Sequence, residues 1–165
     1  NRYSIYHEKN SFHCHFPDEP KRHASTGKIY NPEANAKEDI KAAVKAAAES
    51  GKHIFLQIGG NWCPWCIKFH RFTEADAEIN DFIQKNFVVV KVNYDPKNKN
   101  EEVLAGLGYP QRFGFPVFVV LDDKGNRIHT QNSAFLEKDK DYDRDKVLRF
   151  FKNWSPAALD PANYQ

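Results

Sequence analysis

Three short apolar runs, separated by stretches with helical periodicity, constrain the fold of this chain most strongly. The runs lie at residues 54–58, 87–92 and 117–121. Each has the length of a buried strand and is far shorter than the ~20 apolar residues that span a bilayer. Strands that alternate with helices along a sequence build a sheet with helices packed on both faces. The pattern therefore predicts an α/β protein without a membrane span.

The helices are predicted from caps and from the spacing of apolar residues. We expect them over about residues 36–50, 63–72, 98–107 and 143–153, with one more helix that Thr73 caps. Asn35 is a favourable N-cap for the first helix, and Gly51 suits the position just after its C-terminus. The residues expected on the inner face of this helix are Ile40, Val44, Ala47 and Ala48.

The order of the elements predicts a mixed sheet. A turn at residues 122–125 separates the third apolar run from residues 126–130, so these two strands are expected to form an antiparallel hairpin. The charged stretch at residues 137–146 is expected to be a solvated loop before the last helix. We expect an irregular N-terminal extension at residues 1–33, a domain at 34–155 and a tail at 156–165.

Composition limits the partners and the compartment. A formal net charge of +2 over 165 residues is too close to neutral for a nucleic-acid-binding surface. Three cysteines are too few for a disulfide-stabilised scaffold, and an odd number leaves at least one without a partner in the chain. The chain begins with Asn1, which we interpret as the result of signal-peptide removal, with a cleaved tag as the alternative. We therefore expect an exported, periplasmic protein, with a cytoplasmic location as the alternative. We also expect a monomer.

The segment from Trp62 to Cys66 carries the most specific chemical signal. It reads Trp-Cys-Pro-Trp-Cys and lies between the Gly-Gly-Asn of residues 59–61 and a predicted helix. Cys63 then falls in the first helical turn, where unpaired backbone N–H groups and the helix dipole favour a thiolate. Cys66 lies one turn on, over the same face. Pro64 is tolerated because a first-turn N–H has no helical partner.

This arrangement suits thiol-disulfide exchange, because the thiolate is the attacking species. Cys63 attacks a substrate disulfide and forms a mixed disulfide. Cys66 then attacks that bond, releases the reduced substrate and leaves the pair oxidised. The expected partners are protein disulfides or dithiols and an electron donor that the sequence does not identify. No cofactor is expected.

Several motifs, taken in order, resemble the thioredoxin-like superfamily. They are Trp62-Cys63-Pro64-Trp65-Cys66 after residues 55–58, then residues 90–95, Phe115-Pro116-Val117-Phe118 and residues 120–125. The chain is most similar to the bacterial thioredoxin-related thiol-disulfide oxidoreductases, in which a helix ending in Gly-Lys, here Gly51-Lys52, introduces the motif. The resemblance covers about residues 36–153. It implies a thioredoxin-like fold and a disulfide reductase or isomerase.

The resemblance also implies roles for residues around the two sulfurs. It predicts a cis peptide bond before Pro116, a bond that is rare without such a context, and it places Phe115 beside the substrate pocket. Trp62, Pro64 and Trp65 are expected to contribute to the substrate-binding rim. For Trp62, a position in the core is the alternative.

Two further residues are expected to tune the thiol pKa values. The family often has a buried acid five residues before the first Trp of the motif, where this chain has Gln57, which cannot titrate. In the family, a lysine at the position of Lys91 lies beneath the redox site. An outward orientation of Lys91 at a sheet edge is the alternative. His70, one turn after Cys66, is expected to be a solvated side chain, with tuning of Cys66 as the alternative.

A metal site is the competing use of the cysteines. Tetrahedral zinc needs four ligands, and the chain has no second Cys-x-x-Cys pair. A zinc or copper site would have to recruit His13, Cys14 and His15 to Cys63 and Cys66. We predict no metal at the redox pair and a Cys14 thiol that is dispensable for turnover. A binding domain of the same fold without turnover is a further hypothesis.

Overall fold

The computed structural model describes residues 28–165, so the predictions for His13, Cys14 and His15 lie outside the described residues. The helices are α1 (Ala36–Ser50), α2 (Pro64–Ala75), α3 (Ala77–Asn86), α4 (Glu101–Gly106) and α5 (Arg144–Asn153). The strands are β1 (His53–Gly59), β2 (Phe87–Asn93), β3 (Val117–Leu121), β4 (Arg127–Asn132), β5 (Glu137–Lys138) and β6 (Asp141–Tyr142). Short 3₁₀ helices are η1 (Pro110–Phe113), η2 (Ser133–Leu136), η3 (Pro156–Leu159) and η4 (Pro161–Tyr164).

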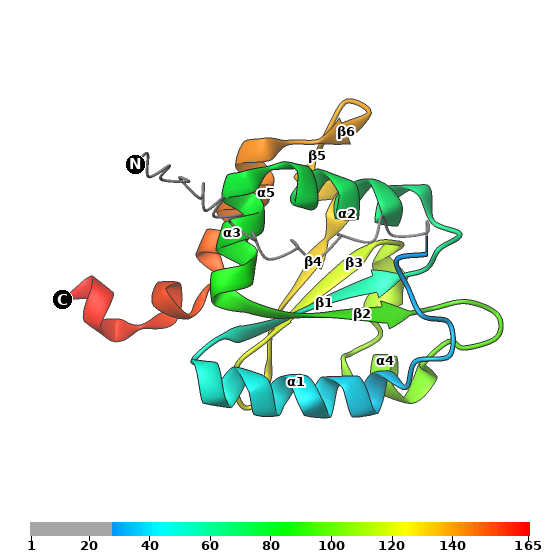
Figure 1. The fold of residues 1–165 in the computed structure, drawn as a ribbon, viewed down its shortest axis with the longest axis horizontal. Helices are drawn as coiled ribbons and strands as arrows, with labels where there is room; N and C mark the ends of the chain where they lie inside the picture. Colours follow the sequence, from blue (N-terminus) through cyan, green and yellow to red (C-terminus); the bar gives the residue numbers. More distant parts are fainter. Residues whose placement is uncertain (1–27) are drawn as a thin grey trace, which may run out of the picture.

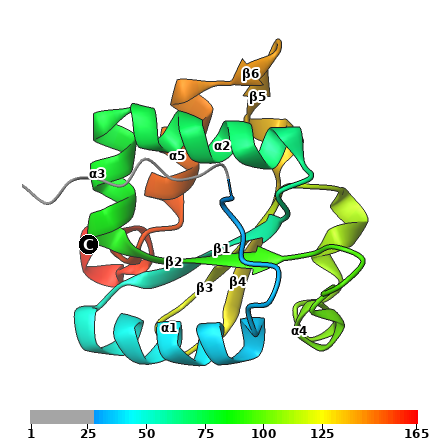
Figure 2. The ribbon, with the colours of Figure 1, turned by 45° about the vertical axis from the view of Figure 1, so that its right-hand side comes forward.

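Within residues 28–165, four strands form one sheet in the order β2-β1-β3-β4. β1 pairs with β2 in parallel, whereas the β1–β3 and β3–β4 pairs are antiparallel. Figure 1 shows α1 and α4 on one face of the sheet and α2, α3 and α5 on the other, and the turned view of Figure 2 keeps this division. The mixed sheet between two helical layers confirms the predicted α/β class. Among the described helices, none has the length and apolarity to cross a membrane.

Alternation along β1 divides the core into two layers, because successive side chains of a strand point to opposite faces. Ile54, Leu56 and Ile58 are buried in the layer that α1 and α4 cover. Phe55 is buried in the other layer, where its ring lies 5.2 Å from Phe118 and 5.0 Å from Phe151. Gln57 shares the face of Phe55 and is therefore directed towards α2.

Helix α1 begins and ends where the sequence predicts. The Asn35 side chain accepts a hydrogen bond from the Glu38 N–H at 3.3 Å, and Gly51 takes a left-handed φ of 67°. The buried residues are Ala36, Ala43 and Ala47, and Ile40 and Val44 are half-buried. The prediction for Ala48 is wrong because this residue is exposed. One residue past Ala47, the helix has rotated by about 100° away from the sheet.

The boundary between α2 and α3 differs from the prediction. Thr73 does not cap a helix, because its hydroxyl donates to the Phe69 carbonyl at 3.1 Å within α2, which continues to Ala75. Asp76 is the actual N-cap of α3, and its carboxylate accepts a hydrogen bond from the Ile79 N–H at 3.1 Å. An aspartate caps more strongly than a threonine whose hydroxyl is already used by its own helix.

Strand β2 lies at one edge of the sheet, and helices pack against both of its faces. Helices α1 and α3 both contact it, which agrees with its nearly continuous apolar sequence. Its outer edge has no strand partner among the described residues. Lys91 on this strand pairs in register with Gln57 of β1. The pleat therefore brings the two side chains together on the α2 face.

The charged stretch at residues 137–146 is not the solvated loop that its charges suggested. It contains the β5–β6 hairpin and then the start of α5. Tyr142 at the end of the hairpin is buried, and its ring contacts Trp65 and Phe69 edge-on at 5.3 and 5.0 Å. One buried aromatic ring thus anchors an otherwise charged segment.

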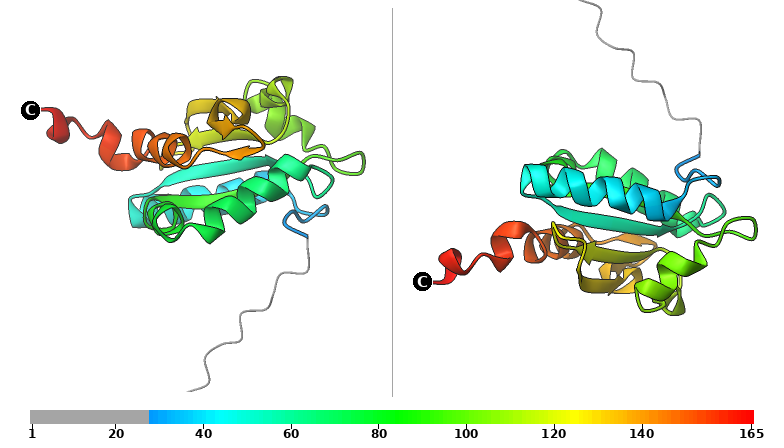
Figure 3. Two further views of the ribbon diagram at one scale, coloured as in Figure 1. Left: turned by 90° about the horizontal axis from the view of Figure 1, so that it is seen from above. Right: turned by 90° about the horizontal axis from the view of Figure 1, so that it is seen from below.

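The chain ends in two 3₁₀ turns, η3 and η4, which extend away from the layers of the sheet (Figure 3). Neither turn contains a buried residue. This segment corresponds to the tail expected at residues 156–165.

Candidate active site

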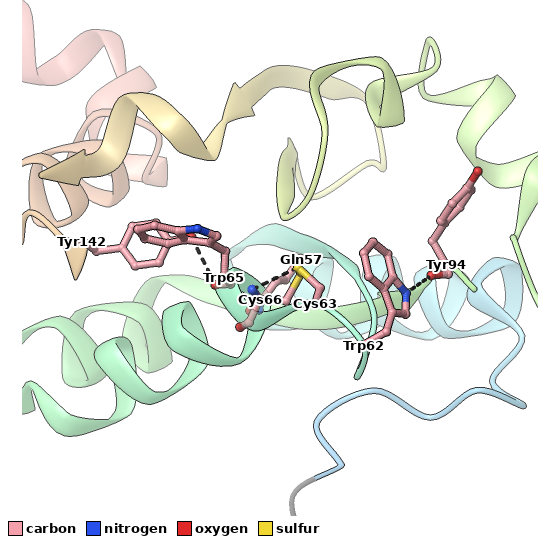
Figure 4. The surroundings of a disulfide bond; sticks show 7 residues. All are labelled: Gln57, Trp62, Cys63, Trp65, Cys66, Tyr94 and Tyr142. Carbon is pink, nitrogen blue, oxygen red and sulfur yellow. Dashed lines mark hydrogen bonds between the residues drawn. A yellow bond between two sulfur atoms is a disulfide. The ribbon is translucent and has the colours of Figure 1, made fainter. Parts of the chain in front are cut away.

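Cys63 and Cys66 form a disulfide at the N-terminus of α2, with their Cα atoms 5.3 Å apart (Figure 4). Cys63 is the N-cap of the helix, and its sulfur accepts a hydrogen bond from the Cys66 N–H at 3.2 Å. Pro64 occupies the first turn, as predicted. Cys63 is 4% exposed and Cys66 is fully buried, so Cys63 is the more accessible sulfur-bearing residue. A helix N-cap stabilises negative charge, which is what a thiolate at Cys63 requires.

The turn that leads from β1 to the redox pair requires glycine at residues 59 and 60, because neither position has room for a side chain. A β-carbon at Gly59 would overlap the sulfur of Cys66, and one at Gly60 would overlap the Trp62 indole. Because these two glycines have no side chains, the main chain at residues 59 and 60 packs directly against the Cys66 sulfur and the Trp62 indole. The Trp62 indole then donates a hydrogen bond to the Tyr94 carbonyl at 2.7 Å.

The two tryptophans of the motif lie on opposite sides of the disulfide (Figure 4). Trp62 is 54% exposed, which excludes the core position considered for it. Trp65 is half-buried, contacts Tyr142 edge-on and accepts a hydrogen bond from the Tyr142 hydroxyl at its carbonyl, 3.2 Å away. The Lys68 ammonium lies over the Trp65 ring, 4.4 Å from its centre. Trp62 is therefore the tryptophan that faces solvent.

Trp62 forms an aromatic wall with two residues from distant loops. Phe115 contacts Trp62 edge-on at 5.5 Å and stacks on Tyr94 at 4.8 Å. The peptide bond between Phe115 and Pro116 is cis. A groove of about 700 Å³ opens beside this wall, and its lining includes Trp62, Tyr94 and Lys97. The aromatic wall is hydrophobic, whereas the lining of the groove includes the charged residues Asp95, Lys97 and Lys99.

A polar network lies beneath Cys66. The buried Gln57 amide donates to the Cys66 carbonyl at 3.3 Å, and its oxygen accepts from the Lys91 ammonium at 2.5 Å. The same ammonium lies 3.3 Å from His70 Nδ1, and His70 Nε2 lies 3.2 Å from the Glu74 carboxylate. Lys91 therefore points inward. His70, expected to be solvated, is instead 19% exposed and held between two charged groups.

Burial sets the charge of this network. It lowers the pKa of Lys91 from 10.5 to about 8, against a small opposing effect of Glu74. Burial also lowers the pKa of His70, and the positive charge of Lys91 lowers it further. At neutral pH the site thus carries one cation, on Lys91, and a neutral imidazole.

Tyr30 is the site residue that the sequence analysis missed. Its side chain is 1% exposed and packs in one cluster with Cys63 and Cys66. The main chain is held by Asn61, whose Oδ1 accepts from the N–H groups of Ile29 and Tyr30 at 2.9 Å. The available signal was the apolar Ile29-Tyr30 pair, which does not stand out in the N-terminal stretch because Ile5-Tyr6 repeats it.

Among residues 28–165, no group of three or more His, Cys, Asp or Glu side chains is placed to hold a metal ion. The described part of the site offers only the two sulfurs, and they are bonded to each other. Nothing in the described residues therefore favours the metal-site alternative.

The sheet order, the helical layers and the disulfide at a helix N-terminus define the thioredoxin class of folds. Residues 35–123 match the family model described as thioredoxin-like, and the chain belongs to that family. No curated protein sequence matches the chain significantly.

Solved structures with the same fold include oxidoreductases of disulfide chemistry. A disulphide isomerase from Xylella fastidiosa Temecula1 is 26% identical, with a TM-score of 0.67 over 76% of this chain and 95% of that one. A DsbH oxidoreductase is 22% identical, with a TM-score of 0.52 over 72% of this chain and 81% of that one. The C-terminal domain of DsbD from Neisseria meningitidis, in its oxidised form, is 20% identical, with a TM-score of 0.51 over 73% and 97%.

Proposed function

We propose that the protein is a thiol-disulfide oxidoreductase that exchanges disulfides with protein substrates through Cys63 and Cys66. The observation that carries the proposal is the disulfide itself, formed at the N-terminus of α2 in a thioredoxin-like fold. The similarity to a disulphide isomerase supports the same chemistry. Because such chemistry acts where disulfides persist, we also propose an exported protein that works in the periplasm.

Cys63 is the attacking residue in this proposal. As the helix N-cap it faces the unpaired N–H groups of the first turn, one of which, the Cys66 N–H, already bonds its sulfur. These donors stabilise a thiolate and so increase the share of Cys63 that is in the attacking form. Cys66, fully buried below, meets the mixed disulfide only from inside and resolves it.

The aromatic wall beside Cys63 is the proposed substrate-binding surface. Trp62 and Phe115 offer apolar area next to Cys63, the less buried of the two cysteines, and the main chain at Phe115 and Pro116 is the proposed contact for the substrate strand. The adjoining groove accepts a side chain of the substrate. Trp65 is more enclosed and is proposed to support the motif through Tyr142.

Reduction of insulin by dithiothreitol, followed by turbidity, tests the proposal. Wild type should accelerate precipitation of the reduced insulin chains, and Cys63→Ser should abolish the acceleration. Cys66→Ser should accumulate a mixed disulfide through Cys63, visible by mass spectrometry. Cys14→Ser is the matched control and should retain activity. Equal activity of wild type and Cys63→Ser, or loss of wild-type activity with a chelator, would contradict the proposal.

The direction of exchange requires a second measurement. Equilibration with glutathione redox buffers gives the reduction potential of the Cys63–Cys66 pair. Refolding of a protein with scrambled disulfides separates an isomerase from a reductase. An isomerase should restore native pairing in a buffer in which it stays partly reduced.

A further inference from the structure

Residues 28–34 are held by hydrogen bonds to two loops, the one that carries the redox pair and the one that follows β2. Asn61 Nδ2 donates to the Tyr30 carbonyl at 2.8 Å, in addition to the two hydrogen bonds that Asn61 Oδ1 accepts from this segment. Asn98 Nδ2 donates to the carbonyls of Pro32 and Ala34 at 3.0 and 2.9 Å. Asn61 directly precedes Trp62, so the segment and the motif are held as one unit.

This fastening places the Tyr30 phenol against Cys66. The β-carbon that Gly59 lacks would overlap the Cys66 sulfur and would lie 3.0 Å from the Tyr30 hydroxyl oxygen. The hydroxyl and the sulfur therefore both border the space that Gly59 leaves free, and no hydrogen bond joins them in the disulfide form. Tyr30 is 1% exposed and Cys66 is fully buried, so no bulk water separates the two.

Among residues 28–165, no hydrogen bond of good geometry reaches the buried Tyr30 hydroxyl while the disulfide is formed, although the Gln57 side chain lies close enough to lower the pKa of the phenol. A buried hydroxyl of this kind destabilises the state in which it is unpaired. Burial raises the pKa of Tyr30, and the nearby Gln57 amide offsets this only in part. The phenol thus keeps its proton and is a hydrogen-bond donor at any working pH.

We propose that Tyr30 donates a hydrogen bond to the Cys66 sulfur when the disulfide is open, and so stabilises the Cys66 thiolate. A disulfide sulfur is a poor acceptor, whereas a thiolate is a strong one. The hydroxyl therefore gains its partner only on reduction. This inference concerns the same site as the proposed function. The catalytic role that it assigns to Tyr30 rests on that function.

The proposed hydrogen bond from Tyr30 to Cys66 affects the step in which Cys66 resolves the mixed disulfide. Cys66 first loses its proton to solvent, and the thiolate then attacks the Cys63 sulfur of the mixed disulfide. The Cys63–Cys66 bond forms, the Cys63–substrate bond breaks, and the substrate sulfur leaves with the electron pair. The substrate disulfide has gained two electrons and the cysteine pair has lost them. Tyr30 transfers no proton and only holds the attacking sulfur ionised and in place.

Other ionisable groups surround Cys66 and have to be kept constant in a test. Cys63 and His70 lie on its own helix, and Glu74 pairs with His70. Lys91 approaches from β2 behind the neutral Gln57. Tyr142 approaches from the β5–β6 hairpin, but its hydroxyl already donates to the Trp65 carbonyl. Tyr142→Phe is therefore a matched control, since it removes a second buried phenol hydroxyl near the same helix.

The first experiment measures the pKa of the Cys66 thiol in a Cys14→Ser/Cys63→Ser background, by nuclear magnetic resonance of isotope-labelled cysteine. Tyr30→Phe should raise this pKa by about one unit, a tenfold loss of thiolate at a given pH. Tyr142→Phe should leave it unchanged. An unchanged pKa in Tyr30→Phe, or equal shifts in both variants, would overturn the inference.

The second experiment compares the thermal unfolding of oxidised and dithiothreitol-reduced protein. Both forms are measured at the same pH, which is chosen above the measured pKa of Cys66 so that this thiol is ionised in the reduced form. Tyr30→Phe should leave the oxidised form as stable as wild type or more stable, and should destabilise the reduced form. A purely structural role for the ring predicts equal shifts in both forms and would refute the proposal. Neither experiment uses a protein substrate. A negative insulin assay would therefore contradict the proposed function, whereas a negative result in these two experiments would contradict only the role of Tyr30.

Discussion

The buried ammonium of Lys91 makes a sharp prediction about stability at alkaline pH. Its pKa falls from 10.5 to about 8 on folding, because burial disfavours the charged form. Between these two values the unfolded chain binds more protons than the native one, so the free energy of unfolding rises with pH. Below pH 8 both states are protonated, and the fold carries the full cost of the buried charge, up to about 3 kcal/mol.

From neutral pH to about pH 9.5 the oxidised protein should therefore gain about 2 kcal/mol of stability from this one group. Few other groups interfere in this window. The disulfide keeps Cys63 and Cys66 from titrating, and the lowered pKa of His70 places its titration on the acid side. Burial raises the pKa of Tyr30 and of Tyr142, so their opposing effect begins only near pH 10, where unfolded tyrosines ionise.

Urea unfolding of the oxidised protein at several pH values, with Cys14 alkylated, measures the effect. Lys91→Met is the control, because it removes the ammonium and keeps a chain of similar length. The absolute stability of this variant also reflects the lost hydrogen bond to Gln57, so the informative quantity is the pH dependence of its difference from wild type. Parallel curves for the two proteins between pH 7 and about 9.5 would refute the argument from burial.

Two more changes test the packing around the disulfide. Gly59→Ala should destabilise the oxidised protein by about 1–3 kcal/mol in urea unfolding, because the new methyl group overlaps the Cys66 sulfur; a stability equal to wild type would contradict the close approach. Asn61→Ala removes three hydrogen bonds to the main chain of Ile29 and Tyr30, each with a net value of about 0.5–1.5 kcal/mol. Amide hydrogen exchange at these two residues should accelerate, with the amides of β1 as the unaffected internal control.

The fold was predictable because the helix caps and the apolar runs are local sequence features, and both indicate the same order of helices and strands. Asn35 and Gly51 delimit α1 by capping chemistry, and the apolar runs mark β1, β2 and β3 by length. The error at the start of α3 occurs where two local rules compete. Thr73 and Asp76 are both acceptable caps, and only the use of the Thr73 hydroxyl within α2 decides between them.

The motif residues of the site were predictable from their spacing, whereas Lys91, Phe115 and Pro116 were placed at the site only through the resemblance to the family. Cys63, Pro64 and Cys66 follow from sequence spacing at a helix start. The orientation of Lys91 depends on its register with Gln57 across two strands that lie far apart in the sequence. Tyr30 depends on a contact between an irregular segment and Gly59, for which sequence periodicity carries no signal.

The tyrosine that lies against Cys66 is outside the part of the chain that defines the family. The family match starts at residue 35, after the tyrosine that lies against Cys66. Residues 28–34 form no helix or strand, and Tyr30 belongs to neither of the two core layers of the sheet. A different residue at position 30 would therefore change what lies against Cys66 without altering the strands and helices of the domain.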